Sequence, residues 1–229
     1  MNILVTAGNT QTPVDDVRCI TNIFTGRTGG MIAARAFERG HTVTLLTSHP
    51  AVIDAIASTR HRGAPDWRVR PYRTFDDLDI AMGEEIGSGK FDAVIHAAAV
   101  SDYRVAGSFT FHDGQFENVS AGKVKSSHPE LWLKLTPTPK LVDKIRSAWG
   151  FGGVLVKFKL EVGLTEAELL AVAEKARVHS SADLICANTL EGMKEWAFVG
   201  AGEGGYRRVT RAELAEYLLE QMAAVRSSR

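Results

Sequence analysis

The sequence has few of the features that mark several common protein classes. Its two cysteines, Cys19 and Cys186, are too few for a disulfide framework or a cysteine-based metal motif. Lysine plus arginine and aspartate plus glutamate each number 27, so the net charge is zero and no overall field attracts nucleic acid or an anionic membrane. No apolar run approaches the roughly 20 residues of a membrane span, and the first residues do not resemble a secretory signal. We therefore expect a cytoplasmic protein that binds neither nucleic acid nor membrane.

The common phosphate-binding loops are also absent. The sequence predicts a strand at 2–7 and a helix at 30–39, but neither G-x-G-x-x-G nor G-x-x-x-x-G-K-[ST] lies between them. Instead, residues 8–30, here called the long loop, contain Gly8, Gly26, Gly29 and Gly30. Glycines let a backbone approach a ligand closely, and the N–H groups at a helix start favour an anion. Because ordered loops this long are usually functional, the long loop is predicted to bind a group such as a phosphate.

Strands and helices alternate along the chain. The strand at 2–7, the helix at 30–39 and a strand at 41–47 predict a right-handed crossover and a parallel sheet. Further strands are predicted at 67–72, 91–99, 131–135, 153–160 and 182–188, further helices at 51–58, 74–86, 140–149, 165–179 and 211–225, and a hairpin at 196–199 and 206–209 around a glycine-rich turn. Thr74 and Thr165 are predicted N-caps. With 229 residues, 45% of them hydrophobic, we expect one domain covering 1–229.

A dinucleotide-binding enzyme is an alternative at this point. The strand at 41–47 ends in Thr47-Ser48-His49-Pro50, without the acid that usually binds the ribose of NAD. NADP enzymes also lack that acid, so this argument against a dehydrogenase is weak. An NADP-dependent oxidoreductase is further disfavoured because no Tyr-x-x-x-Lys pair follows the strand at 91–99 and the glycine spacing is absent.

Ten residues of the long loop match a longer signature, which reads roughly G-G-T-x-E-P-[IL]-D-x-V-R-x-[IL]-[ST]-N-x-S-S-G-K-M-G. They are Gly8, Thr10, Pro13, Asp15, Val17, Arg18, Ile20, Asn22, Gly26 and Gly29. In these residues the chain resembles the phosphopantothenoylcysteine synthetases, or phosphopantothenate–cysteine ligases. The departures are Asn9 for the second glycine, Thr12 for Glu, Phe24-Thr25 for two serines, and Arg27-Thr28 for Lys-Met.

Three later segments extend the resemblance. Residues 98–104 (AAVSDYR) match the family's A-A-V-A-D-Y-[RK], and 182–188 (ADLICAN) match its D-[LI]-[IV]-x-A-N. In AGKVKSS, Lys123 and Lys125 align with the first and third positions of K-[IL]-K-K, an element on a flap over the nucleotide. Two family lysines are missing, because Ala176 and Ser180 stand at their positions, and Lys157 replaces a glycine.

The resemblance implies a fold and a reaction. The expected fold is a three-layer α/β/α Rossmann-like domain with a mostly parallel sheet, a late antiparallel strand and a flap at about 105–127, and the expected assembly is a homodimer. The expected reaction belongs to coenzyme A biosynthesis. CTP or ATP, with Mg²⁺, would activate 4′-phosphopantothenate, and the amine of cysteine would then attack the acyl-nucleotidylate.

The resemblance also implies roles for individual residues. Lys123 would be the catalytic cation at the α-phosphate, and Asn22 would hold the acyl intermediate, with Arg18 as a second substrate contact. The predicted nucleotide-binding residues are Gly8, Thr10, Gly26, Arg27, Gly29, Ala98, Ala99, Val100, Asp102, Lys125 and Asn188. No metal-ligating residue is predicted.

Each role has a plainer alternative. Lys123 is otherwise a solvated loop lysine, Asn22 a turn residue and Asp102 a helix N-cap. Arg18 and Arg27 are otherwise surface arginines, and His96 is interpreted as a hydrogen-bonded core histidine. Because the two serines and two lysines of the family are missing, a homologue with altered substrates, or one that binds a nucleotide without turnover, also stays open.

Overall fold

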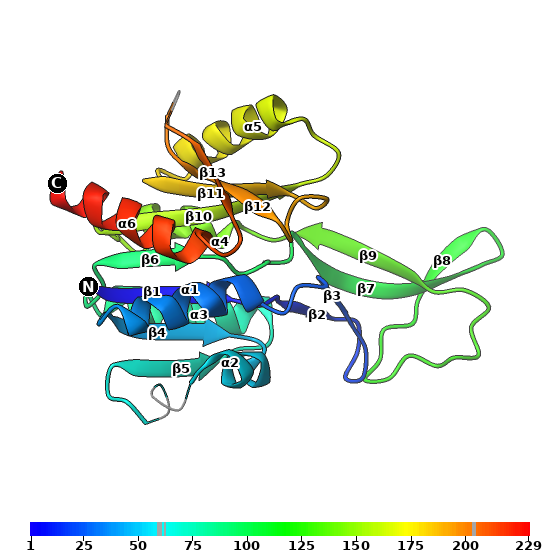
Figure 1. Cartoon of the computed structure of the whole chain (residues 1–229). Helices are drawn as coiled ribbons and strands as arrows, with labels where there is room; N and C mark the ends of the chain where they lie inside the picture. Colours follow the sequence, from blue (N-terminus) through cyan, green and yellow to red (C-terminus); the bar gives the residue numbers. More distant parts are fainter. Residues whose placement is uncertain (59–60, 62, 203–204) are drawn as a thin grey trace.

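A central sheet of eight strands organises the computed structural model, which describes residues 1–58, 61, 63–202 and 205–229. Its strands are β1 (Asn2–Ala7), β4 (Thr42–Thr47), β5 (Trp67–Pro71), β6 (Ala93–His96), β10 (Val154–Glu161), β11 (Leu184–Thr189), β12 (Trp196–Gly200) and β13 (Arg207–Thr210). Their order is β13-β12-β11-β10-β6-β1-β4-β5 (Figure 1). The strands from β5 to β11 are parallel, whereas β12 is antiparallel to both neighbours. The predicted late antiparallel strand is thereby confirmed.

Helices cover both faces of this sheet. They are α1 (Arg27–Glu38), α2 (Pro50–Ile56), α3 (Phe75–Gly87), α4 (Leu141–Ser147), α5 (Glu166–His179) and α6 (Leu214–Ser227). Alternate side chains of β1 reach different helices, because Ile3 and Val5 belong to the core cluster of α1, α2 and α6, whereas Leu4 belongs to that of α3 and α4. Leu169 of α5 packs on Ile185 of β11. The predicted three-layer α/β/α fold is confirmed.

The helix starts show what local sequence could and could not predict. The side chains of Thr74 and Thr165 accept hydrogen bonds from the third residue of α3 and α5, so both predicted N-caps are confirmed. The predicted start at residue 30 is wrong, because α1 begins at Arg27. Gly26 has φ 80° and turns the chain into the helix three residues early. The predicted strand 91–99 is also too long, since β6 ends at His96. The predicted glycine-rich turn lies partly outside the described residues.

The flap contains regular structure that the sequence did not predict. Strands β7 (Tyr103–His112) and β8 (Gln115–Asn118) form an antiparallel hairpin, and β9 (Trp132–Pro137) pairs with the other edge of β7. The predicted strand 131–135 therefore belongs to this separate three-stranded sheet, here called the flap sheet, which projects from the central sheet in Figure 1. Within the long loop, β2 (Gln11–Pro13) and β3 (Cys19–Thr21) form a second small hairpin.

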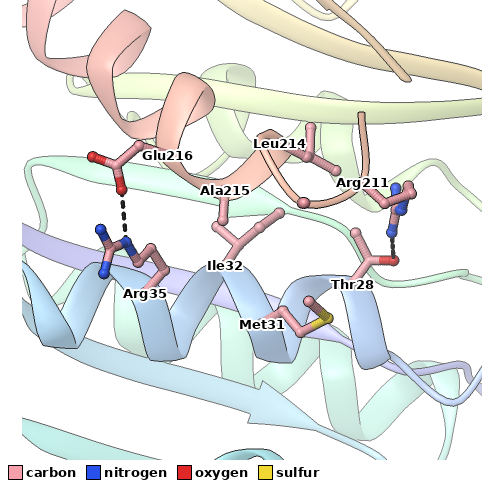
Figure 2. A pocket seen from close by; sticks show the side chains of 9 residues that line it. Thr28, Met31, Ile32, Arg35, Arg211, Leu214, Ala215 and Glu216 are labelled. Carbon is pink, nitrogen blue, oxygen red and sulfur yellow. Dashed lines mark hydrogen bonds and ion pairs between the residues drawn. The ribbon is translucent and has the colours of Figure 1, made fainter. Parts of the chain in front are cut away.

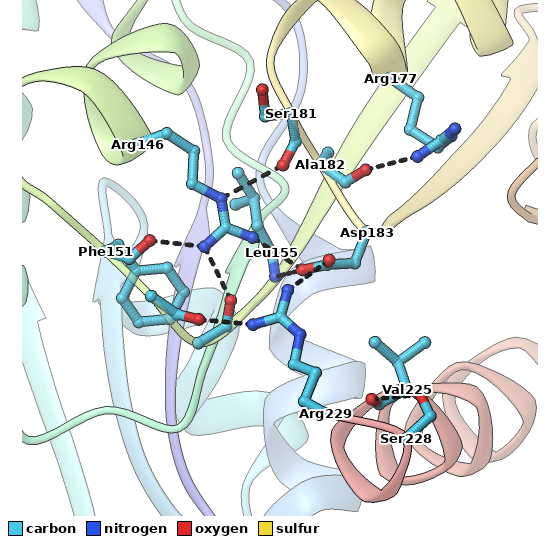
Figure 3. A network of polar contacts seen from close by, with 12 residues as sticks. Arg146, Phe151, Leu155, Arg177, Ser181, Ala182, Asp183, Val225, Ser228 and Arg229 are labelled. Atoms are coloured by element: carbon cyan, nitrogen blue, oxygen red, sulfur yellow. Dashed lines mark hydrogen bonds and ion pairs between the residues drawn. The ribbon is translucent and has the colours of Figure 1, made fainter.

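A polar network ties the amino ends of β10 and β11 to the chain terminus (Figure 3). Asp183 accepts hydrogen bonds from the Leu155 N–H at 2.7 Å and from the Arg146 Nη2 at 2.8 Å, and it also binds Arg229. Arg146 also donates to the carbonyl of Gly153 at 2.8 Å. This network lies at the sheet edge opposite the carboxyl ends of the strands.

We expect Asp183→Asn to lower the free energy of unfolding by about 2 kcal/mol, because Arg146 loses its carboxylate partner. Urea unfolding would measure the loss. Glu166→Gln is the matched control, because its ion pair with Arg208 is about half exposed and we expect little change. Equal effects of the two substitutions would contradict a structural role for the network.

Candidate functional site

The sheet has a topological switch point between β1 and β6. From β1 the chain continues to β4 and β5 on one side, and β6, β10 and β11 follow on the other. Open α/β sheets bind ligands outside the carboxyl ends of strands at such a point. Here the residues just past those ends are 8–10 and 97–100, which together with Asn22 we call the crevice.

The carbonyl of Ala99 joins the two sides of the crevice. It accepts hydrogen bonds from the Thr10 N–H at 3.3 Å and from the Asn22 Nδ2 at 3.0 Å. The Ala99 N–H donates in turn to the carbonyl of Gly8 at 2.8 Å. Four residues that the sequence assigned to one site are thus in direct contact.

The glycines allow the long loop to lie close against the sheet. Gly8 and Gly26 have φ values of 98° and 80°, a region in which residues with side chains are strained. A Cβ on Gly26 would overlap the backbone nitrogen of Gly8, and one on Gly29 would lie 2.8 Å from the Ala7 Cβ. These three glycines position the start of α1 at the crevice, whereas their contact with a nucleotide stays a prediction.

Two residues that hold the crevice together, Asn9 and Ser48, were not assigned to the site by the sequence. The Asn9 side chain donates to the carbonyl of Asn22 and accepts from the Ser48 Oγ at 3.1 Å, and Ser48 accepts from the Asn9 N–H at 2.9 Å. Asn9 thereby connects the long loop to the end of β4. The only available signal was that Asn9 departs from the glycine of the signature.

The remaining crevice residues form its walls. Thr10 is fully buried, and its Oγ1 accepts from the Ser101 N–H at 2.8 Å, so its hydroxyl supports the loop from within the protein. Ala98 and Val100 are half-buried. Arg27 is exposed at the first position of α1.

Asp102 and Asn188 lie at the same sheet edge but make different contacts. Asp102 is exposed and forms an ion pair with Lys140. Its alternative interpretation as a helix N-cap is wrong, because strand β7 follows it. Asn188 is half-buried in β11, in register with Leu160 of β10, and so lies two strands away from β6.

The predicted cations form a second group, away from the crevice contacts. Arg18 binds Asp15 and donates from its Nη2 to the carbonyl of Val124 at 2.7 Å. Lys123 and Lys125 are exposed, and neither makes a hydrogen bond or ion pair within the part of the chain that the structure describes. No hydrogen bond between described residues joins Arg18 or Lys123 directly to Asn22 or Ala99. The sequence analysis therefore assigned to one site residues that form two groups, the crevice on one side and Arg18, Lys123 and Lys125 on the other.

A lysine from β10 reaches the positions at which the family lysines are missing. The Lys157 Nζ donates to the Ala176 carbonyl at 2.9 Å and to the Ser180 Oγ at 2.6 Å. Burial lowers the pKa of Lys157.

On the strand adjacent to β10, His96 is bonded to the Thr6 Oγ1 at 2.9 Å, and burial lowers the pKa of His96 to about 4. His96 is thus the hydrogen-bonded core histidine that the sequence predicted.

A cavity of about 300 Å³ lies between α1 and the start of α6 (Figure 2). Ile32 and Leu214 form part of its apolar wall. Its two ends are closed by the pairs Arg35–Glu216, at 2.6 Å, and Arg211–Thr28. No predicted site residue lines this cavity, and its polar ends are already bonded.

The family comparison covers nearly the whole chain. A model of the family described as "DNA/pantothenate metabolism flavoprotein C-terminal domain" matches residues 1–223. The chain belongs to this family. It is 35% identical over 225 residues to the coenzyme A biosynthesis bifunctional protein CoaBC of Thermococcus kodakarensis, with 96% of this chain and 50% of the relative aligned. The chain thus spans about half the length of this curated relative.

Solved structures support the fold assignment. The DNA/pantothenate metabolism flavoprotein from Streptococcus pneumoniae has a TM-score of 0.82 and 30% identity, covering 98% of this chain and 99% of that one. A Cab2 mutant in complex with phosphopantothenate-cysteine has a TM-score of 0.73 and 17% identity, covering 99% of this chain and 86% of that one. At that identity the second likeness concerns the fold alone.

A pair of glycine substitutions tests the close approach at the crevice. Gly40 has φ 79° but open space around its Cβ position, whereas at Gly26 a Cβ meets the backbone of Gly8. We expect Gly40→Ala to cost about 1 kcal/mol from backbone strain, and Gly26→Ala about 2–4 kcal/mol. Urea unfolding would measure both, and equal losses would show that the loop is not held against β1 as described.

Proposed function

We propose that this chain is a phosphopantothenate–cysteine ligase of coenzyme A biosynthesis. The observation that carries the proposal is the family match over residues 1–223, together with a matching signature that folds around the switch point of the sheet. A member of the same family, CoaBC, is named for coenzyme A biosynthesis. Its activity belongs to a chain about twice as long, so the assignment to this chain is our proposal.

The proposed reaction has two steps. A carboxylate oxygen of 4′-phosphopantothenate attacks the α-phosphorus of CTP or ATP, and the bond from that phosphorus to pyrophosphate breaks. The amine of cysteine then attacks the acyl carbon, expels the nucleoside monophosphate and loses a proton, which forms the amide. The first step brings anions together, so it depends on cations and N–H donors that are in place beforehand.

The residues divide between these tasks. Asn22, held at the Ala99 carbonyl, would orient the acyl group and the amine from the crevice. Lys123, with its ammonium free of protein partners among the described residues, would neutralise charge at the α-phosphate. Arg18 would contact the acid, while Gly8, Gly26, Arg27, Gly29 and the backbone at 98–100 would surround the nucleotide, with Asp102, Lys125 and Asn188 at its edges.

Mg²⁺ would have to arrive with the nucleotide. Among the described residues, no group of three or more His, Cys, Asp or Glu could hold a metal ion. Mg²⁺ commonly keeps several waters and binds substrate phosphates rather than a complete protein cage. The crevice is therefore compatible with a Mg²⁺–nucleotide complex that the protein binds chiefly through the phosphates.

We also propose that the chain forms a homodimer through the flap sheet. Phe111, Phe116 and Trp132 pack together with ring centroids 5.1 and 5.5 Å apart, yet they are 42%, 58% and 50% exposed. Clustered exposed aromatic side chains are typical of protein interfaces. A second copy of this chain is the partner that the homodimer prediction names.

No helix of the described residues is long and apolar enough to cross a membrane.

Pyrophosphate release separates the ligase from its alternatives. We expect release when the protein is mixed with CTP or ATP, Mg²⁺, 4′-phosphopantothenate and cysteine. Thermal stabilisation by CTP or ATP without pyrophosphate release would indicate a nucleotide-binding homologue without turnover. Stabilisation by NADPH instead would indicate an oxidoreductase.

Two substitutions test the division of labour. We expect Lys123→Ala to slow acyl-nucleotide formation by about 100-fold, because the developing charge loses its cation. Asn22→Ala should let the acyl-nucleotide accumulate, because only the second step is impaired. Quenched-flow analysis of the intermediate would measure both. Lys194→Ala, at an exposed lysine between β11 and β12, is the control, and unchanged kinetics in both Lys123→Ala and Asn22→Ala would refute the assignment.

The dimer proposal has its own test. We expect Phe116→Ser combined with Trp132→Ser to convert a dimer into a monomer in analytical ultracentrifugation, because the aromatic face is lost. Ile80→Ser on α3, also exposed but away from the flap sheet, should leave the mass unchanged. A dimer that survives the double substitution would place the interface elsewhere.

A further inference from the structure

The tip of the long loop is bonded to the flap, although the two segments are about a hundred residues apart. Asp16 donates its N–H to the Gly122 carbonyl at 2.9 Å, and Asp15 and Arg18 both bond to Val124. Figure 1 shows the segment between β2 and β3 beside the segment that follows β8. We call the group Asp15, Arg18, Gly122 and Val124 the latch.

Asp15 is the centre of the latch. Its side chain is 0% exposed, whereas that of Arg18 is 44% exposed. One carboxylate oxygen accepts from the N–H groups of Val17 and Arg18, at 3.0 and 2.7 Å. The other accepts from the guanidinium of Arg18 and from the Val124 N–H at 3.1 Å. Each oxygen therefore serves at least two donors, and the carboxylate is fully used within the protein.

Both polar groups of the Val124 backbone are fixed by this arrangement. Its N–H donates to Asp15, and its carbonyl accepts from the Arg18 Nη2 at 2.7 Å. The Val124 side chain is 3% exposed, so it is buried as well. On the other side of Lys123, the Gly122 carbonyl accepts from Asp16, and a Cβ at Gly122 would lie 2.8 Å from the Asp16 carboxylate. Lys123 thus lies between two anchored neighbours while its own side chain remains exposed.

Electrostatics make the latch persistent. The Arg18 guanidinium, with help from the backbone N–H groups, holds the pKa of Asp15 well below its usual range. A carboxyl whose pKa is depressed on folding contributes its stabilisation above its unfolded pKa and loses it only as the pH falls through the folded value. Asp15 therefore stays ionised across the neutral range, and the latch does not open with ordinary changes of pH.

We propose that Asp15 is a positioning residue, which fixes Lys123 and Arg18 as one unit for acyl-nucleotide formation. This inference rests on the proposed ligase function. Asp15 touches no reacting atom in this scheme. It acts by holding the backbone next to the flap lysine and the guanidinium of Arg18, so that two cations from segments about a hundred residues apart are presented together.

Two substitutions of neighbouring aspartates separate this role from a general charge effect. Asp15→Asn keeps the shape but removes the charge that accepts from Arg18 and Val124. Asp16→Asn removes a charge one residue away, whose carboxylate makes no hydrogen bond among the described residues. We expect Asp15→Asn to reduce kcat for pyrophosphate release about tenfold, with kcat/KM for cysteine unchanged because cysteine reacts only after pyrophosphate has left. Asp16→Asn should leave both constants unchanged, and Asp15→Glu should restore part of the rate.

A double-mutant cycle shows whether Asp15 acts through Lys123. In the Lys123→Ala background, Asp15→Asn should reduce the rate further by only about twofold to threefold, well below its tenfold effect alone, because one of the two cations that it positions is gone and only Arg18 remains. If the two losses instead multiply, Asp15 acts independently of Lys123 and the proposal is wrong.

Amide hydrogen exchange tests the latch without reference to activity. We expect the Val124 N–H to exchange at least about tenfold faster in Asp15→Asn than in the unsubstituted protein, and at the same rate in Asp16→Asn. Unchanged exchange in Asp15→Asn overturns the latch, whether or not the chain is active. Absence of pyrophosphate release from the unsubstituted protein instead refutes the ligase function, and with it the catalytic part of this proposal.

Discussion

The carbonyl of Ala99 is the contact on which the candidate site depends. It lies past the end of β6 and accepts hydrogen bonds from Thr10 and Asn22, the residues immediately before and after the β2–β3 hairpin. A long connection between a strand and its helix would otherwise carry a large conformational entropy. The Ala99 carbonyl and the close approach of Gly26 to Gly8 reduce the conformational freedom of the long loop at the topological switch point of the sheet. The rest of the loop is then free to extend toward the flap.

The separation of the crevice from the cations is the arrangement by which a chain with no net charge would bind the anions of the proposed reaction. The crevice consists mainly of backbone groups, small side chains and the Asn22 amide, whereas Arg18 and Lys123 lie at the far end of the same loop and on the flap. Because Arg18 and Lys123 are exposed and lie on different segments, packing in a hydrophobic core does not fix their positions relative to each other. Among the described residues, Arg18 bonds to the flap only through the latch. The latch depends on the carboxylate of Asp15, which is shielded from solvent.

The sequence predicted those parts of the fold that local patterns determine. Apolar, β-branched runs located most strands of the central sheet, and Thr74 and Thr165 gave the correct helix starts because an N-cap is a local interaction. Of the flap sheet only the strand at 131–135 was predicted, since its strands pair with each other and have no apolar face that the core of the central sheet requires. Asp15 was visible only as one letter of a signature, because its partner Val124 lies far away in the chain. The sequence could therefore name most crevice residues, though not Asn9, and could not name the contacts that connect the long loop to the flap.

Lys157 shows why a missing motif residue is not the same as a missing charge. Compared position by position, Ala176 and Ser180 indicate that α5 has lost two lysines. In three dimensions, the ammonium of Lys157 reaches the backbone of one of these residues and the hydroxyl of the other from β10. The Ser180 hydroxyl continues the chain of hydrogen bonds to Asp143 at 2.8 Å, so the buried cation is connected to a carboxylate through one neutral group. A charge that is expensive to bury is retained here with two neutral partners and with a carboxylate behind one of them, so a cation remains beside the positions at which the family lysines are missing.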